Sequence, residues 1–258
     1  MQNLKIAGIQ FNISWKDKKT NYSYLENEIS RVFDADIIVL PEMFQTGFCF
    51  DVDQLAEEFE NSRTLIWLKE QAQNSGSALL GSFMAKEGDN VYNRLVFMQP
   101  NGSFDFYDKR HLFSMSAEPE YFTAGKRKLL INYKGWKICP MVCYDLRFPV
   151  WMRNKEQYDL LIFIANWPQR RSMHWEKLLQ ARAIENQCYV TGINRVGDDG
   201  NGVYHDGRSA IINALGEPIT MAINQEETLQ ATLQKRHLST IREKMPFLND
   251  ADDFKLKI

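Results

Sequence analysis

Three ionisable side chains in this sequence follow short strand-like stretches that lie far apart along the chain. Cys143 and Lys109 each come directly after such a stretch, and Glu42 ends a third. A cysteine nucleophile needs a base or a cation beside it, because its thiol is mostly protonated at neutral pH. A glutamate can take the proton, and a lysine can stabilise an oxyanion together with the backbone N–H of Tyr144. The three residues therefore predict a hydrolytic site with a cysteine nucleophile.

Each of the three residues also has an ordinary structural explanation. A free cysteine at a strand end often packs as a small hydrophobic residue, and Glu42 and Lys109 could lie in solvated turns. Their joint occurrence at three strand ends favours a catalytic site. A cysteine hydrolase that uses His111 or His205 as its base remains an alternative.

The elements that must position these side chains are short strands alternating with helices. Alternating or continuous apolar runs predict strands over residues 4–11, 36–40, 78–84, 91–98, 136–142, 160–165, 188–193 and 209–214. Apolar residues at helical spacing predict helices over 21–33, 62–76 and 173–187, the second with Ser62 as its N-cap and Gly76 at its end. The alternation indicates an α/β layer fold, and a hairpin across Gly88-Asp89-Asn90 indicates a mixed sheet.

The composition predicts one large domain over 1–258, with a more polar C-terminal tail from about residue 239. A chain of 258 residues with 44% hydrophobic content can bury a sizeable core. The formal net charge of -2 gives no general attraction to nucleic acid or to an anionic membrane surface. No apolar run approaches the roughly 20 residues that a membrane span needs. We therefore expect neither nucleic acid nor membrane as a partner.

The cysteines and histidines bear on compartment and cofactors. The four cysteines form no C-x-x-C pair, and the N-terminus lacks a signal-peptide pattern, so a reducing, cytoplasmic setting is expected. The four histidines are not at the spacing of metal ligands. No metal or organic cofactor is expected.

The motifs around the three candidate residues resemble those of a known family. They read Leu-Pro-Glu-Met-Phe over 40–44, Tyr-Asp-Lys-Arg-His-Leu-Phe over 107–113 and Cys-Tyr-Asp-Leu-Arg-Phe-Pro over 143–149. In this order and spacing they resemble the nitrilase superfamily of carbon–nitrogen hydrolases. The likeness continues through 165–168, 181–186 and 194–197, and it is greatest to the omega-amidase branch.

The resemblance implies a fold, an activity and a set of site residues. The fold would be a four-layer α-β-β-α sandwich, usually paired into a homodimer, with Glu42, Lys109 and Cys143 as a catalytic triad. A family pattern of glutamate, aromatic residue and glycine fits Glu118, Phe122 and Gly125, with Glu120 as the competing second glutamate. The substrate would be a small 2-oxo acid with a terminal amide, such as 2-oxoglutaramate. Another amidase, an N-carbamoyl hydrolase or a non-enzymatic protein that binds small amides remain alternatives.

A substrate with a distal carboxylate would need an arginine at the far end of the pocket, because a guanidinium group binds a carboxylate with two hydrogen bonds. The loop after Asn166 offers Arg170 and Arg171, of which Arg171 is the predicted contact. Trp167, Phe44 and Phe113 are the predicted aromatic walls.

Overall fold

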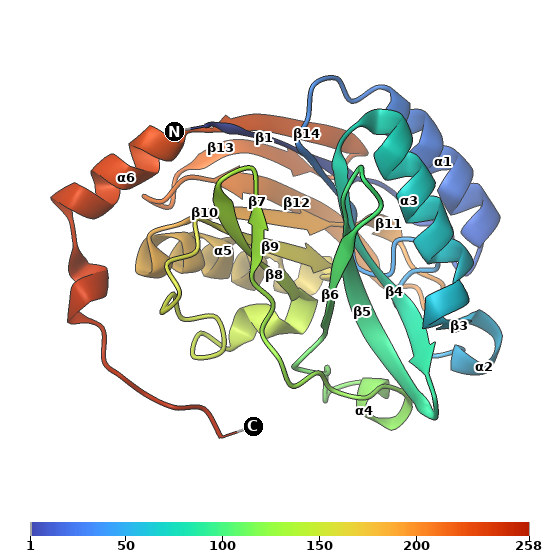
Figure 1. Ribbon diagram of the computed structural model, residues 1–258. Helices are drawn as coiled ribbons and strands as arrows, with labels where there is room; N and C mark the ends of the chain where they lie inside the picture. Colours follow the sequence, from blue (N-terminus) through green and yellow to red (C-terminus); the bar gives the residue numbers. More distant parts are fainter. Residues whose placement is uncertain (1, 258) are drawn as a thin grey trace.

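Two β-sheets pack face to face between two layers of helices in this computed structural model, which describes residues 2–257 (Figure 1). Helices α1 (Lys18–Ser30) and α3 (Arg63–Ser75) cover the outer face of the first sheet. Helix α5 (Ser172–Asn186) covers the outer face of the second. The predicted four-layer α-β-β-α sandwich is confirmed.

The first sheet is mixed and runs in the order β14-β1-β2-β4-β5-β6, with the short β3 beside β4. Strands β1, β2 and β4 are parallel, and β4 and β5 form the predicted antiparallel hairpin. The strands are β1 (Leu4–Gln10), β2 (Ile37–Val39), β3 (Glu57–Glu58), β4 (Ala78–Glu87), β5 (Asn90–Met98), β6 (Phe104–Asp108) and β14 (Glu227–Leu233).

The second sheet runs in the order β11-β12-β10-β9-β8-β7, with β13 beside β12. Its central strands β8, β9 and β10 are parallel, so their carboxyl ends lie at one edge of the sheet. Cys143 and Asn166 directly follow β8 and β9 at this edge. The strands are β7 (Ile131–Tyr133), β8 (Trp136–Val142), β9 (Leu160–Ala165), β10 (Tyr189–Asn194), β11 (Val196–Asp198), β12 (Tyr204–Ile212) and β13 (Pro218–Ile223).

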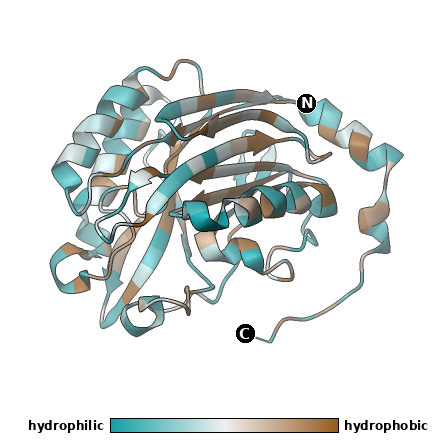
Figure 2. Cartoon of the chain, turned by 180° about the vertical axis from the view of Figure 1, so that it is seen from behind, coloured by the Kyte–Doolittle hydropathy of each residue, from teal (hydrophilic) through white to brown (hydrophobic). Residues whose placement is uncertain are grey.

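Alternate side chains of the first sheet enter two different cores. Leu4 and Ile6 of β1 pack in the core between the sheets, whereas Ala7 and Ile9 pack in the core beneath α1 and α3. The helices carry both hydrophobic and hydrophilic residues (Figure 2), and the buried hydrophobic side chains of α1 and α3 lie in the second of these cores. Helix α3 begins and ends as predicted, because the Ser62 side chain accepts a hydrogen bond from the Leu65 N–H at 3.0 Å and Gly76 adopts a left-handed φ of 68°.

Residues 2–257 hold three further α-helices, α2 (Val52–Leu55), α4 (Glu118–Tyr121) and α6 (Lys235–Lys244), and four short 3-10 helices, η1 (Phe59–Asn61), η2 (Cys143–Arg147), η3 (Gln169–Arg171) and η4 (Phe247–Asp250). The expected start of the tail, near residue 239, falls inside α6, and the chain beyond it leads to the C-terminus at the edge of the molecule (Figure 1). Among residues 2–257, no helix has the length and apolar character needed to cross a membrane.

Candidate active site

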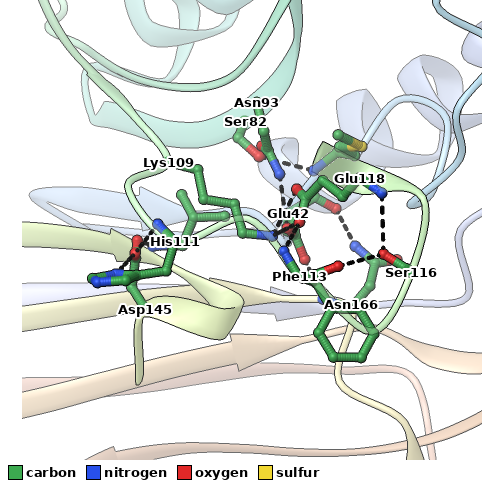
Figure 3. A network of polar contacts seen from close by, with 12 residues as sticks. Glu42, Ser82, Asn93, Lys109, His111, Phe113, Ser116, Glu118, Asp145 and Asn166 are labelled. Carbon is green, nitrogen blue, oxygen red and sulfur yellow. Dashed lines mark hydrogen bonds and ion pairs between the residues drawn. The ribbon is translucent and has the colours of Figure 1, made fainter. Parts of the chain in front are cut away.

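Glu42, Lys109 and Cys143 meet at the bottom of one pocket, although each follows a different strand. Glu42 lies beyond β2, Lys109 follows β6, and Cys143 follows β8, so the pocket forms where edges of both sheets meet. The Lys109 ammonium group lies 3.0 Å from the Glu42 carboxylate (Figure 3). Both side chains are buried.

The Glu42 carboxylate is held by donors from both sheets. Asn93 on β5 donates a side-chain hydrogen bond to Oε1 at 2.8 Å, and the backbone N–H of Asn166 donates to Oε2 at 2.8 Å. The Asn166 side chain also donates to the Glu42 backbone carbonyl at 2.6 Å. The position of this carboxylate is therefore fixed before any substrate arrives.

Glu118 is the second carboxylate at Lys109. Its two oxygens accept hydrogen bonds from Lys109 Nζ at 2.8 and 2.9 Å, and it also accepts one from the Phe113 backbone N–H. Glu118 is fully buried, whereas Glu120 is exposed and makes no such contact. Gly125 of the same pattern packs against the backbone before Lys109, where an added Cβ would lie 2.0 Å from the Asp108 carbonyl oxygen.

The two carboxylates determine the charge of the lysine. Burial disfavours the ammonium form, but Glu118 and Glu42 outweigh this effect and raise the pKa of Lys109 above its ordinary value. Burial also raises the pKa of Glu118, against the opposing effect of Lys109. Lys109 therefore stays protonated throughout the physiological pH range.

Cys143 stands in a strained turn beside these charges. Its φ of 44° lies in the left-handed region, which is uncommon for a residue with a side chain. Burial raises the pKa of Cys143 well above its ordinary value, Glu42 raises it further, and Lys109 lowers it. The resting cysteine is therefore a thiol that needs a base before it can attack a carbon atom.

The pocket above the three residues has a volume of about 160 Å³ and both aromatic and cationic walls. Arg171 lies 5.2 Å from the centre of the Phe113 ring, and Arg147 lies 4.7 Å from the centre of the Trp167 ring. Tyr144 packs edge-on against Phe113. The residues that line the pocket are Glu42, Phe48, Phe50, Lys109, Phe113, Ser116, Cys143, Tyr144, Arg147, Asn166, Trp167, Pro168, Arg170, Arg171, Asp199, Asn201, Val203 and His205.

The prediction that Phe44 forms a wall of the pocket is wrong. Phe44 is fully buried and packs against Trp67 of α3, with ring centres 5.5 Å apart. A tight turn, closed by the hydrogen bond from the Gly47 N–H to the Met43 carbonyl at 2.8 Å, directs this side chain into the core. Phe48 takes a place in the pocket wall instead.

The three arginines of the pocket wall have no acidic partner among residues 2–257. Within the part of the chain that the structure describes, Arg147, Arg170 and Arg171 form no ion pair with a carboxylate. Burial and the neighbouring Arg170 lower the pKa of Arg171. Such a group of unpaired cations, close to the thiol, is suited to bind an anionic end of a ligand.

The two histidines proposed as alternative bases occupy different places. His111 lies outside the pocket lining, with Nδ1 2.8 Å from Asp145 and its ring stacked on Phe148. His205 lines the pocket, and burial together with Arg195 lowers its pKa to about 4. Over the described range, 2–257, no group of histidine, cysteine and acidic side chains is arranged to hold a metal ion.

The chain matches a family model described as carbon-nitrogen hydrolase over residues 5–243. It is 42% identical to the omega-amidase of Escherichia coli, with 99% of this chain and 100% of the relative covered. It is 32% identical to the 2-oxoglutaramate amidase of Bacillus subtilis, with 95% and 96% covered. A solved CN-hydrolase superfamily protein from Xanthomonas campestris, with an arsenic adduct in its active site, is 38% identical and superposes with a TM-score of 0.97 over 100% of both chains. The chain therefore belongs to the carbon–nitrogen hydrolase family and is a hydrolase of carbon–nitrogen bonds.

Proposed function

We propose that this protein is an omega-amidase, which hydrolyses the terminal amide of a small 2-oxo acid such as 2-oxoglutaramate to the carboxylate and ammonia. The observation that carries the proposal is a pocket that joins a thiol, a carboxylate and an ammonium group to three arginines in its wall, which form no ion pair with any carboxylate of residues 2–257. The similarity to an omega-amidase and to a 2-oxoglutaramate amidase supports it.

In the proposed mechanism, Glu42 takes the proton from Cys143 as the sulfur attacks the amide carbon. Lys109 and the backbone N–H of Tyr144 stabilise the oxyanion of the tetrahedral intermediate. The carbon–nitrogen bond then breaks, Glu42 gives its proton to the leaving nitrogen, and ammonia departs from a thioester on Cys143. Glu42 next takes a proton from a water molecule, whose oxygen attacks the thioester. The carbon–sulfur bond then breaks, Glu42 returns this proton to the sulfur of Cys143, and the released acid loses its own proton to solvent and becomes the carboxylate.

Glu118 is proposed to act on Lys109 and on the attacking water. Its two oxygens each accept a hydrogen bond from the ammonium group, and these contacts keep Lys109 charged and oriented toward Glu42. A fixed cation at this point is worth more for an oxyanion than a mobile one, because it does not have to reorient during the reaction.

Arg171 is proposed to bind the substrate carboxylate. It lies in the same wall as Phe113, Trp167 and Tyr144, whose rings would enclose the carbon chain between the two polar ends.

The test is ammonia release by the purified protein from 2-oxoglutaramate, a simple nitrile and an N-carbamoyl amino acid. We expect 2-oxoglutaramate to have the highest kcat/KM. A preference for the carbamoyl compound, which also has a carboxylate for the arginines, would make the protein an N-carbamoyl hydrolase. Hydrolysis of none of the three would favour a protein that only binds small amides.

We also propose that the protein is a cytoplasmic homodimer. Ile184 on the outer layer helix α5 and Leu215 are hydrophobic side chains exposed to 47% and 41%. Burial of such groups against a second copy would remove them from water. Light scattering of the purified protein tests the dimer, and a single-chain mass would exclude it.

A further inference from the structure

Asp145 is a buried carboxylate two residues after Cys143, and it accepts four hydrogen bonds. Its Oδ2 accepts from the Val142 backbone N–H at 3.0 Å and from the Tyr107 hydroxyl at 2.8 Å. Its Oδ1 accepts from the backbone N–H of His111 at 2.9 Å and lies 2.8 Å from the ring nitrogen Nδ1 of the same residue. Asp145 is not one of the residues that line the pocket, so a ligand bound there would leave these contacts in place.

The groups that donate hydrogen bonds to Asp145 belong to two segments of the chain. One segment holds the Cys143 thiol and the other holds the Lys109 ammonium group. Val142 ends β8 of the second sheet and directly precedes Cys143. Tyr107 belongs to β6 of the first sheet, and His111 lies two residues beyond Lys109 (Figure 3). One carboxylate therefore joins the segment that carries the thiol to the segment that carries the ammonium group.

The Tyr107 hydroxyl uses its full hydrogen-bonding capacity in this arrangement. It accepts hydrogen bonds from Trp151 Nε1 at 3.1 Å and from the Arg110 backbone N–H at 3.2 Å, and it donates to Asp145. A hydroxyl has one hydrogen and two lone pairs, so all three of its positions are in use. Among residues 2–257, the hydrogen of this hydroxyl bonds to Asp145 alone.

The turn that Asp145 supports is a strained one. Cys143 has a left-handed φ, and such a conformation persists only where the surrounding structure holds it. Asp145 fixes the residue before Cys143, and the Arg182 guanidinium of α5 donates to the Leu146 carbonyl at 2.7 Å on the other side. The thiol is thus held from both ends of its turn.

We propose that Asp145, acting with Tyr107, is a positioning residue that sets the distance between the Cys143 thiol and the Lys109–Glu42 pair. The reaction used to test this proposal is the amide hydrolysis of the proposed function, and in this respect the proposal rests on that function. Asp145 takes no part in the chemical steps. It acts by holding two segments in register, and an error of about 1 Å in such a geometry can lower a rate roughly 100-fold.

Two substitutions test this role. Asp145→Asn keeps the size of the side chain. Its NH2 group, however, cannot accept the hydrogen bonds that one carboxylate oxygen of Asp145 accepts. Tyr107→Phe removes only the hydroxyl, so it tests the same link if the first variant fails to fold. Tyr158→Phe is the matched control, because Tyr158 is a fully buried tyrosine whose hydroxyl donates to the Met152 carbonyl and which lies outside the pocket lining.

The readouts are kcat, KM and the thermal midpoint, measured below the lowest midpoint of the set. We expect Tyr107→Phe to lose more stability than Tyr158→Phe, since the Tyr107 hydroxyl makes three buried hydrogen bonds and the Tyr158 hydroxyl makes one to Met152. We expect kcat to fall at least about tenfold in Tyr107→Phe and Asp145→Asn, with KM within about threefold of wild type, because the loss affects the transition state. Equal kcat values for Tyr107→Phe, Asp145→Asn and Tyr158→Phe would overturn the proposal.

A wild-type protein that hydrolyses no amide would refute the proposed function and not this inference. The readout is then the rate at which iodoacetamide alkylates Cys143, followed by mass spectrometry of the folded protein. We expect alkylation at least about fivefold slower in Tyr107→Phe and Asp145→Asn than in Tyr158→Phe, because a displaced thiol loses Glu42 as its base. The same rate in all three variants would refute the positioning role.

Discussion

Replacement of Glu118 by glutamine removes one of the two negative charges at Lys109 and almost nothing else. Glutamine has nearly the same shape and keeps one oxygen that can accept from the ammonium group. Glu120→Gln is the matched control, since it makes the same chemical change two residues away on an exposed side chain. The pair of variants also decides which glutamate serves the site.

The size of the effect follows from the distances at Lys109. Two unit charges 2.8 Å apart attract by roughly 6 kcal/mol at an effective dielectric constant of about 20. Much of this is offset, because the buried Glu118 no longer has to be desolvated as an anion and Glu42 remains 3.0 Å from the lysine. A net loss of about 2 to 3 kcal/mol at the transition state would lower kcat roughly 30- to 160-fold.

The assay is ammonia release at saturating 2-oxoglutaramate, with thermal unfolding of each variant as the measure of folding. We expect Glu120→Gln to match wild type in both measurements. A folded Glu118→Gln protein with kcat within about threefold of wild type would refute the reasoning, because the second carboxylate would then be dispensable for the charge and position of Lys109.

The remaining predictions concern the nucleophile, the arginine and a buried histidine. Cys143→Ala should abolish turnover with an unchanged thermal midpoint, and amide hydrolysis retained in that variant would exclude the thioester. Arg171→Met should raise KM for 2-oxoglutaramate at least about tenfold, since a charged hydrogen bond contributes roughly 1.5–3 kcal/mol, but leave KM for a neutral amide within about twofold. His205 has a folded pKa of about 4 against an ordinary 6.5, so its neutral form stabilises the fold above pH 6.5 and this contribution, at most about 3 kcal/mol, is lost as the pH falls from 6.5 toward 4. Denaturant titrations should therefore show a smaller acid destabilisation in His205→Phe than in wild type, and equal slopes would contradict the shifted pKa.

The central strands were the most predictable part of the fold. The runs 136–142 and 160–165 predict β8 and β9 at their observed bounds, because a strand buried on both faces is apolar throughout. The edge strand β14 was missed, since its apolar alternation is limited to Leu229, Ala231 and Leu233 and its hydrogen-bond partner, β1, lies more than 200 residues away. Helix α6 was missed because the segment is rich in charged residues.

The residues at the base of the pocket were also predictable, but most of its walls were not. Glu42, Lys109 and Cys143 each follow a strand, and the end of an apolar run in the sequence predicts where such a strand ends. Phe48 and Arg147 line the pocket because of tight turns that precede them, at Met43 with φ of 45° and at Cys143 with φ of 44°. No apolar periodicity encodes such a backbone conformation, so the direction of the following side chains could not be read from the sequence.

The charges of the site account for a carboxylate base rather than a histidine base in the proposed mechanism. Lys109 stays positive because two carboxylates raise its pKa, and Cys143 is a neutral thiol in the resting state. Transfer of the proton from Cys143 to Glu42 moves one negative charge from oxygen to sulfur and creates no new positive charge beside the fixed cation. A neutral histidine would become positive in the same step, next to a lysine that already carries a positive charge, and this repulsion would oppose the transfer. The buried ammonium group that the oxyanion needs therefore also favours a carboxylate over a histidine as the base.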